Sequence, residues 1–400
     1  MKLTHAHLEC RPISALRLGG SAALLWAILV LGGCASSDES TPEWAGVKNE
    51  DEPAKLVDFD STAQFKVRWQ KNIGDSGSNL LQPAIVGDAI YAVSIEGLLT
   101  RMDRKTGKKA WRLKTGITAS GGVGGGEDLI VIGSNKGNVL AYDENGRSLW
   151  KSKVSSEVLN VSRVEDGIVI VRSGDGRIAG LNAANGERVW VYERSTPALV
   201  VRSHAGVTIQ RGILYAGFAG GRLAAIKIND GEVLWETSVS QPSGNTELER
   251  ISDITGDPVV DDEQVCAVAF QGRLACYDIT RGNPLWNRDL SSDKGMMLLR
   301  GYLYLSDAKS SVIEMDRSSG NTVWKNDQLF MRSVSSPFVM EDFVIVGDRL
   351  GYLHALSRID GHFTARIKLD GGSIKARILP LDEGLLLQTS GGDVYSMSIR

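Results

Sequence analysis

A glycine followed four residues later by tryptophan recurs along this chain, and this repeat constrains the fold more than any other feature. The tryptophans are Trp69, which stands ahead of the series, and then Trp111, Trp150, Trp190, Trp235, Trp286 and Trp324, while Gly361 and Ala365 continue the pattern without the ring. Successive members are 42, 39, 40, 45, 51, 38 and 41 residues apart. A period of this length is typical of a repeat architecture in which every unit supplies one small group of secondary-structure elements.

Each repeat is expected to form four short strands. Between residues 83 and 111, runs of β-branched and apolar residues are separated by Gly-Asp, Glu-Gly and Thr-Gly pairs, which are turn signals. Four antiparallel strands per unit, repeated around a ring, predict an all-β protein of the β-propeller class. Each tryptophan lies near the start of the last strand of its unit, where we expect its ring to wedge against the neighbouring blade. The unit that has Ala365 at this place is expected to be the looser one.

The two ends of the ordered region determine the number of blades. Residues 65–70 (FKVRWQ) read as a last-type strand with no blade of its own, and residues 394–399 (VYSMSI) match the third strand of a unit. The two segments are therefore expected to complete one shared blade. This predicts an eight-bladed β-propeller whose closure removes exposed sheet edges.

The N-terminal segment is expected to direct export. Basic residues precede an apolar run at 22–31, which is too short to span a membrane comfortably and is followed by Gly-Gly-Cys34. This resembles a bacterial lipobox, in which Cys34 is lipidated; the alternative is an ordinary signal peptide with a chance cysteine. Ala35 in place of aspartate indicates the outer membrane, with the protein facing the periplasm. We expect a signal peptide at 1–33, a lipidated and flexible acidic tether at 34–64 and the propeller at 65–400.

No catalytic residue, metal site or cofactor is expected. Three histidines follow the signal segment, at 204, 354 and 362, without metal-ligand spacing, and no Cys-x-x-Cys occurs. The glycine run at 121–126 precedes a strand and is interpreted as an inner strand, not a phosphate loop. The net charge of −3, without a basic stripe, argues against nucleic acid. A disulfide between Cys266 and Cys276 stays open, because a three-residue loop would place them opposite each other and a two-residue turn would not.

Two consecutive connections between units are unusually long. They precede Trp235 and Trp286 and comprise residues 192–207 and residues 240–258. As equivalent connections of adjacent blades they are expected to lie side by side, and unit-specific insertions on a repeat scaffold tend to carry function. Leu199 and Val201 either form part of an inner strand or belong to a protein interface, whereas we favour the interface for Arg202 and Asp253.

The cysteine of a lipobox, an acidic tether and eight units of this repeat closed by the chain ends resemble the BamB family of lipoproteins, over residues 34–400. The resemblance implies a non-enzymatic scaffold of the β-barrel assembly machinery. Such a scaffold docks on the POTRA domains of the barrel subunit BamA and joins the other assembly lipoproteins. It helps outer-membrane proteins fold and insert, and nascent outer-membrane proteins are a further possible partner. The family's contact segment corresponds to Leu199, Val201 and Arg202, with Val201 where the family has leucine. Its Asp-x-Asp corresponds to Asp253 and Thr255, so one carboxylate is lost.

Two alternatives remain from other functional classes. The tryptophan repeat is shared with quinoprotein dehydrogenases, which use a calcium site, a catalytic carboxylate and often adjacent cysteines, and none of the cysteines here are adjacent. The other alternative is a lipid-anchored periplasmic propeller that binds a different ligand or envelope protein.

Overall fold

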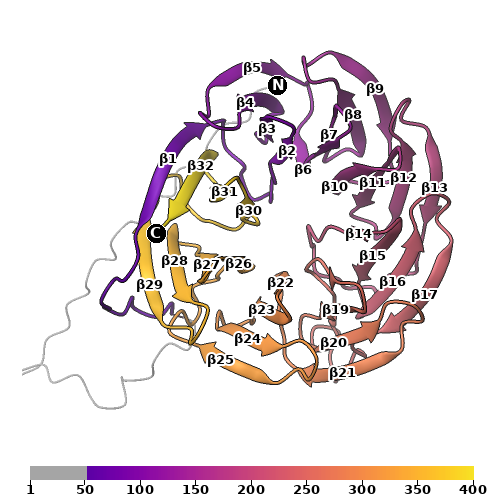
Figure 1. Ribbon diagram of the computed structural model, residues 1–400. Helices are drawn as coiled ribbons and strands as arrows, with labels where there is room; N and C mark the ends of the chain where they lie inside the picture. Colours follow the sequence, from indigo (N-terminus) through magenta and orange to yellow (C-terminus); the bar gives the residue numbers. More distant parts are fainter. Residues whose placement is uncertain (1–51) are drawn as a thin grey trace, which may run out of the picture. The chain divides into compact units, whose positions relative to one another are not determined.

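The computed structural model describes residues 52–400, which form a ring of eight four-stranded antiparallel sheets (Figure 1). The first four blades are β2 (Ala84–Val86), β3 (Ala89–Val93), β4 (Leu98–Asp103) and β5 (Lys109–Lys114); β6 (Ala119–Gly126), β7 (Leu129–Ser134), β8 (Asn138–Tyr142) and β9 (Ser148–Lys153); β10 (Val158–Glu165), β11 (Ile168–Ser173), β12 (Ile178–Asn182) and β13 (Arg188–Tyr192); and β14 (Thr208–Gln210), β15 (Ile213–Phe218), β16 (Arg222–Lys227) and β17 (Val233–Ser238).

The next three blades are β18 (Val259–Val260), β19 (Gln264–Val268), β20 (Arg273–Asp278) and β21 (Pro284–Asp289); β22 (Met296–Leu299), β23 (Tyr302–Ser306), β24 (Val312–Asp316) and β25 (Thr322–Asn326); and β26 (Phe338–Met340), β27 (Phe343–Gly347), β28 (Tyr352–Ser357) and β29 (Phe363–Lys368). The last blade is shared by the chain ends and contains β30 (Leu379–Pro380), β31 (Leu385–Gln388), β32 (Asp393–Ile399) and β1 (Phe65–Asn72). The predicted eight-bladed propeller is confirmed. No helix long and apolar enough to cross a membrane occurs in the part of the chain that the structure describes.

Closure of the ring follows the predicted pairing of the chain ends. β1 pairs with β32 from Phe65 opposite Ile399 to Asn72 opposite Asp393, and the Gln64 N–H donates to the Arg400 carbonyl at 2.7 Å. Within a blade, the second and third strands pack between the neighbouring blades and are mostly buried and apolar, as in β3. The fourth strand faces solvent and alternates between exposed and buried positions.

The glycine and the tryptophan of the repeat meet between neighbouring blades. The indole of Trp69 covers Gly107, and a Cβ added to this glycine would lie 2.6 Å from the ring. The same relation joins each tryptophan from Trp150 to Trp324 to the turn glycine of the following blade, whereas at Gly146 the nearest atom belongs to Leu113 and the Trp111 ring is 3.4 Å away. The indole N–H of Trp190 then donates to the Ile228 carbonyl of that blade at 2.7 Å. The expected wedge between blades is confirmed, and the glycine of the motif is conserved within the repeat because it receives the preceding ring.

Ala365 replaces the tryptophan of the repeat in the blade whose neighbour lacks a turn between its third and fourth strands. Between β32 and β1 the chain ends stand in place of the third-to-fourth strand turn, so no turn glycine is present to receive a ring. Residues 54–64 cover this seam: the N–H groups of Thr62 and Ala63 donate to the Thr364 carbonyl, and the Phe59 ring packs on Phe363 with centroids 5.5 Å apart. Phe363 and Ala365 are buried, so this blade is covered by the N-terminal segment instead of by a tryptophan.

The N-terminal segment differs from the expected flexible tether over its last residues. The expected tether reached residue 64, but the Ala54 N–H donates to the Phe330 carbonyl and the Ala54 carbonyl accepts from Arg332. Arg366 donates to the Val57 carbonyl at 2.8 Å and stacks on Phe59. Apolar residues at 57 and 59 explain why this stretch packs against the protein. We call residues 54–64 the strap; Cys34 and the signal segment lie outside the described residues.

Cys266 and Cys276 form a disulfide. They are direct cross-strand partners on β19 and β20, and the Ala269 N–H donates to the Arg273 carbonyl. Three residues, 270–272, therefore lie between this last hydrogen-bonded pair. Of the two registers that the sequence analysis left open, the structure has the one with a three-residue loop, which places the two cysteines opposite each other. The glycine run at 121–126 lies in β6, the inner strand of its blade, as predicted.

Candidate functional site

The two long connections, residues 192–207 and 240–258, run side by side. Because all blades have the same strand order, every connection from a fourth strand to the next first strand emerges at the same end of the ring, which we call the connection end. The Ser203 hydroxyl donates to the Thr255 carbonyl at 2.7 Å, and the Gly206 N–H donates to the Asp257 carboxylate. The expected neighbourhood of the two segments is confirmed.

Asp253 lies beneath this surface and not on it. Its side chain is only 3 % exposed, and both carboxylate oxygens are used internally, one by the Val201 N–H at 2.7 Å and the other by the Gly220 N–H at 2.9 Å. Thr255 is also buried. Ile254 between them fills the space above Gly217 in the core, which draws its neighbours below the surface. This differs from the expectation that Asp253 and Thr255 face a partner: they hold the 192–207 connection in place.

The exposed part of the site is apolar. Leu199 and Val200 are 40 % and 38 % exposed, whereas Val201 is half-buried. The second apolar residue of this surface is therefore Val200, which the sequence analysis did not name, and not Val201. Both readings of this stretch are therefore partly correct, since Val201 turns inward and Leu199 outward. We call Leu199 and Val200 the apolar tip.

Arg202 is exposed at the edge of the apolar tip but is not free. Its guanidinium donates to the Glu157 carboxylate at 2.8 Å and to the Asn79 side chain at 3.2 Å. A half-exposed ion pair of this kind contributes about 0–1 kcal/mol. Arg202 can therefore exchange Glu157 for a carboxylate on another protein at little cost.

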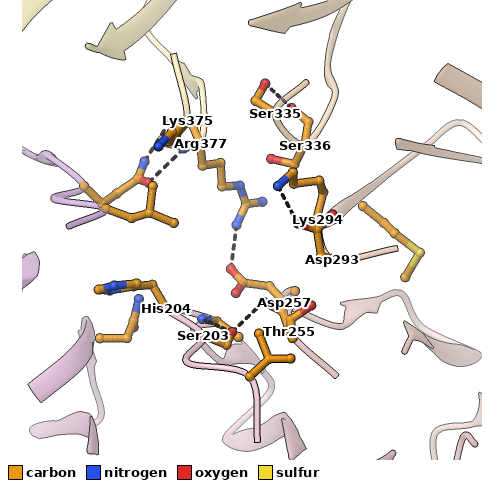
Figure 2. A pocket seen from close by; sticks show the side chains of 18 of the residues that line it. Ser203, His204, Thr255, Asp257, Asp293, Lys294, Ser335, Ser336, Lys375 and Arg377 are labelled. Carbon is orange, nitrogen blue, oxygen red and sulfur yellow. Dashed lines mark hydrogen bonds and ion pairs between the residues drawn. The ribbon is translucent and has the colours of Figure 1, made fainter. Parts of the chain in front are cut away.

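A cavity of about 480 Å³ opens on the ring axis at the same end (Figure 2). Residues from the connections of most blades line it, and the Arg377 guanidinium reaches across to the Asp257 carboxylate at 3.0 Å. Lys294 pairs in the same way with Asp293. Lys375 and Arg202 also line this space, so its cationic side chains outnumber the carboxylates of Asp257 and Asp293.

Of the hydroxyl and imidazole groups that line the axial cavity, those of Ser203, Ser335 and His204 bond to the backbone, whereas Oγ1 of Thr255 has no hydrogen-bond partner among residues 52–400. Ser335 donates to the Ser336 carbonyl, and Ser203 to that of Thr255. Burial, assisted by the Arg202 charge, lowers the pKa of His204, whose Nδ1 lies 3.1 Å from the Leu159 carbonyl and whose Nε2 lies 3.0 Å from Arg202. Within residues 52–400, no three His, Cys, Asp or Glu side chains are grouped to hold a metal ion. The geometry pairs none of these hydroxyls with a base.

A second cavity, of about 290 Å³, lies under the 192–207 connection. Its lining includes Arg172, Phe218 and Val200, and Arg172 is 7 % exposed. Sequence reasoning missed Arg172, although an arginine inside the apolar run Ile168–Ser173 is a signal that could have found it. The connection end thus combines an apolar tip, an exchangeable arginine and a buried cation under one loop.

The comparisons with known proteins agree on one family. Residues 95–326 match the family model described as outer membrane protein assembly factor BamB. The protein of that name from Nitrosomonas eutropha is 40% identical over 385 residues, which is 94% of each chain. The crystal structure of BamB from Moraxella catarrhalis aligns with a TM-score of 0.77 at 26% identity, covering 84% of this chain and 99% of that one. A europium-containing methanol dehydrogenase shares the fold, with a TM-score of 0.71 at 13% identity. The full-length match and the eight-bladed ring agree, and this chain belongs to the BamB family of outer membrane protein assembly factors.

Proposed function

We propose that this protein is a non-enzymatic scaffold of the outer-membrane β-barrel assembly complex. It docks on the periplasmic POTRA domains of a BamA-like barrel protein, beside the other lipoproteins of the complex, and assists the folding and insertion of outer-membrane proteins. Family membership supports the assembly role. The observation that supports the docking site is the exposed apolar tip at the connection end, next to Val201, whose N–H donates to the buried Asp253 carboxylate.

The apolar tip has the composition of an interface centre. Leu199 and Val200 together offer apolar surface that the fold leaves exposed, and Arg202 stands beside them with a partner it can exchange. Interface energy concentrates in such apolar centres with an arginine at the edge. A rigid loop also loses little conformational entropy when it binds, because Asp253 has already fixed it.

We further propose that Cys34 is lipidated and anchors the protein in the outer membrane, facing the periplasm, with a signal peptide at 1–33 and a tether that ends where the strap begins. The Cys266–Cys276 disulfide supports an exported propeller, because disulfides persist in oxidising compartments such as the periplasm. Lipidation at one cysteine with more than one acyl chain gives stable anchoring.

The test is co-purification of the barrel subunit with tagged, lipidated protein from mildly solubilised envelopes. Leu199→Asp with Val200→Asp is expected to weaken binding about 30-fold or more, since truncating an interface centre costs about 2 kcal/mol. The matched control is Ile359→Asp, which changes an 80 % exposed apolar residue in the β28–β29 turn at the opposite end of the ring. Equal recovery of the barrel subunit with both variants would move the docking site elsewhere, and no barrel subunit with the unaltered chain would contradict the scaffold role.

A further inference from the structure

Arg172 is a buried cation that forms no ion pair within the described part of the chain. It lies on β11, and its Nη2 donates to the Gly217 carbonyl at 2.5 Å while its guanidinium stands 5.3 Å from the centre of the Phe218 ring. Its Nη1 has no hydrogen-bond partner among residues 52–400. Burial lowers the pKa of Arg172 to about 10, against the pull of Asp257 and Asp253, so the group is still charged at neutral pH.

The two nearby carboxylates are committed to other groups. Asp253 accepts from the backbone N–H groups of Val201 and Gly220, and Asp257 accepts from the Gly206 N–H and from Arg377. Neither accepts a hydrogen bond from Arg172. A buried charge with an unsatisfied N–H is costly, and such groups are normally paired. Arg172 therefore has room for one more acceptor, and an anionic acceptor fits best.

The space for this acceptor is the cavity of about 290 Å³ under the 192–207 connection. Phe218, Ile254 and Leu159 provide apolar lining, and Val200 of the apolar tip covers it from above. Two other arginines and two carboxylates also line the cavity, but Arg202 pairs with Glu157 and Arg194 with Glu236. Asp253 is taken up by backbone N–H groups, so Arg172 is the lining cation that a single entering carboxylate would balance. The cavity thus suits a side chain with a short apolar stem and one negative charge.

We propose that this cavity receives an aspartate or glutamate of the docking partner, flanked by apolar residues that cover Leu199 and Val200, and that its carboxylate pairs with Arg172. This proposal rests on the proposed function and specifies the partner's chemistry. A charge-assisted bond in a desolvated cavity discriminates strongly against partners without the acid, because these leave the cation unpaired. Nη1 is covered in the unbound protein, so the side chains over it must move when the carboxylate enters.

The test measures the affinity of the full propeller for the purified periplasmic region of the cognate barrel subunit. Arg172→Met, which keeps most of the volume and removes the charge, is expected to weaken binding at least tenfold, while Arg172→Lys recovers part of it. Thermal unfolding and amide exchange at Val201 check that the connection stays in place. An Arg172→Met affinity within twofold of the unaltered protein would overturn the proposal.

A second measurement leaves this chain unaltered, so it holds even if Arg172→Met fails to fold. Each acidic residue of the barrel subunit's periplasmic region is changed to its amide, and one such change is expected to weaken binding tenfold or more. The same change is expected to have no further effect in combination with Arg172→Met. A scan with no tenfold loss, or losses that persist in full with Arg172→Met, would overturn the proposal.

The two levels of proposal fail in different ways. Binding that is sensitive to Leu199→Asp but indifferent to Arg172→Met and to the acid-to-amide scan would overturn the carboxylate site and keep the scaffold function. No binding by the unaltered protein would overturn both.

Discussion

Asp253 and Val201 are 52 residues apart in the sequence, yet the Asp253 carboxylate accepts a 2.7 Å hydrogen bond from the Val201 N–H. The second carboxylate oxygen accepts from the Gly220 N–H of the β15–β16 turn. One buried side chain therefore joins two long connections and a hairpin turn. We therefore expect Asp253 to affect the proposed docking through the loop that it holds, since its buried carboxylate cannot contact a partner directly.

Asp253→Ala is expected to loosen the 192–207 connection. Two backbone N–H groups lose their acceptor, and each such loss costs about 1–3 kcal/mol when the group stays buried. Amide hydrogen exchange at Val201 and Gly220 should accelerate strongly, and affinity for the barrel subunit should fall with it. Asp289→Ala, which removes an exposed carboxylate paired only with Arg273, is the control. Unchanged exchange at both amides would contradict this role of Asp253.

Gly107→Ala is expected to destabilise the propeller more than Gly87→Ala. Both glycines have positive φ, 64° and 55°, so both substitutions carry backbone strain. Only Gly107 lies against a ring, where an added Cβ would be 2.6 Å from Trp69, whereas nothing lies within 4 Å of a Cβ at Gly87. The difference in the free energy of unfolding should be about 1–3 kcal/mol, as for other overpacked sites. Equal denaturant midpoints for the two variants would show that the ring contact contributes nothing.

Replacing both Cys266 and Cys276 by alanine is expected to lower the free energy of unfolding by about 2–4 kcal/mol, because the crosslink restricts the unfolded chain. A reducing agent should lower the denaturant midpoint of the unaltered protein and leave that of the double variant unchanged. A midpoint that does not respond to reduction in the unaltered protein would mean that the disulfide does not form or does not stabilise the fold.

Phe59→Ala is expected to weaken the packing of the strap on the propeller and so to lower the free energy of unfolding. Phe59 contacts the Phe363 ring and lies 4.8 Å from Arg366, at the seam where Ala365 leaves no tryptophan. Because the ring is half-buried, the loss should be about 1–3 kcal/mol, less than for a fully buried phenylalanine. Asp60→Ala, at an exposed neighbouring position, is the control. Removal of residues 1–53 should preserve stability and removal of residues 1–64 should not, and equal stability of the two shortened chains would exclude a role for the strap.

Stability is expected to fall below neutral pH through His354. Burial, followed by the charges of Arg366 and Arg332, lowers the pKa of His354 below its ordinary 6.5 despite the nearby Asp348. Its Nδ1 accepts from Arg366 at 3.1 Å, which leaves no site for a second proton. The unfolded chain therefore binds a proton that the native chain does not, so stability is fully present above pH 6.5 and is lost as pH falls toward the lowered pKa.

Asp348 extends this loss to lower pH. Burial acts to raise the pKa of Asp348, but hydrogen bonds from His354, the Tyr352 N–H and Arg332 outweigh it and lower the pKa below 3.8. Its contribution is therefore present above that value and is lost below it. The free energy of unfolding, measured with denaturant at several pH values between 4 and 8, should change less with pH for His354→Gln than for the unaltered protein. An identical pH dependence of the two proteins would contradict the assignment to His354.

The repeat made most of the fold predictable before any coordinates. The Gly-x-x-x-Trp spacing, the turn pairs and the strand fragments at both ends are local patterns, and each of them implies the same ring of eight blades. The side-by-side connections were also predictable, because equivalent connections of adjacent blades must be neighbours. Local patterns suffice for these features, since the strands of each blade pack mainly against the two adjacent blades.

Tertiary structure alone decided which residues of the site face outward. Sequence order places Leu199, Val201, Arg202, Asp253 and Thr255 in two loops, but their side-chain directions depend on contacts made across the ring. Ile254 packs into the core, so its neighbour Asp253 is buried as well. Arg172 lies beneath the loop although it precedes Val201 by 29 residues in the chain. Burial and hydrogen bonding are properties of neighbours that are distant in sequence, so no local pattern records them.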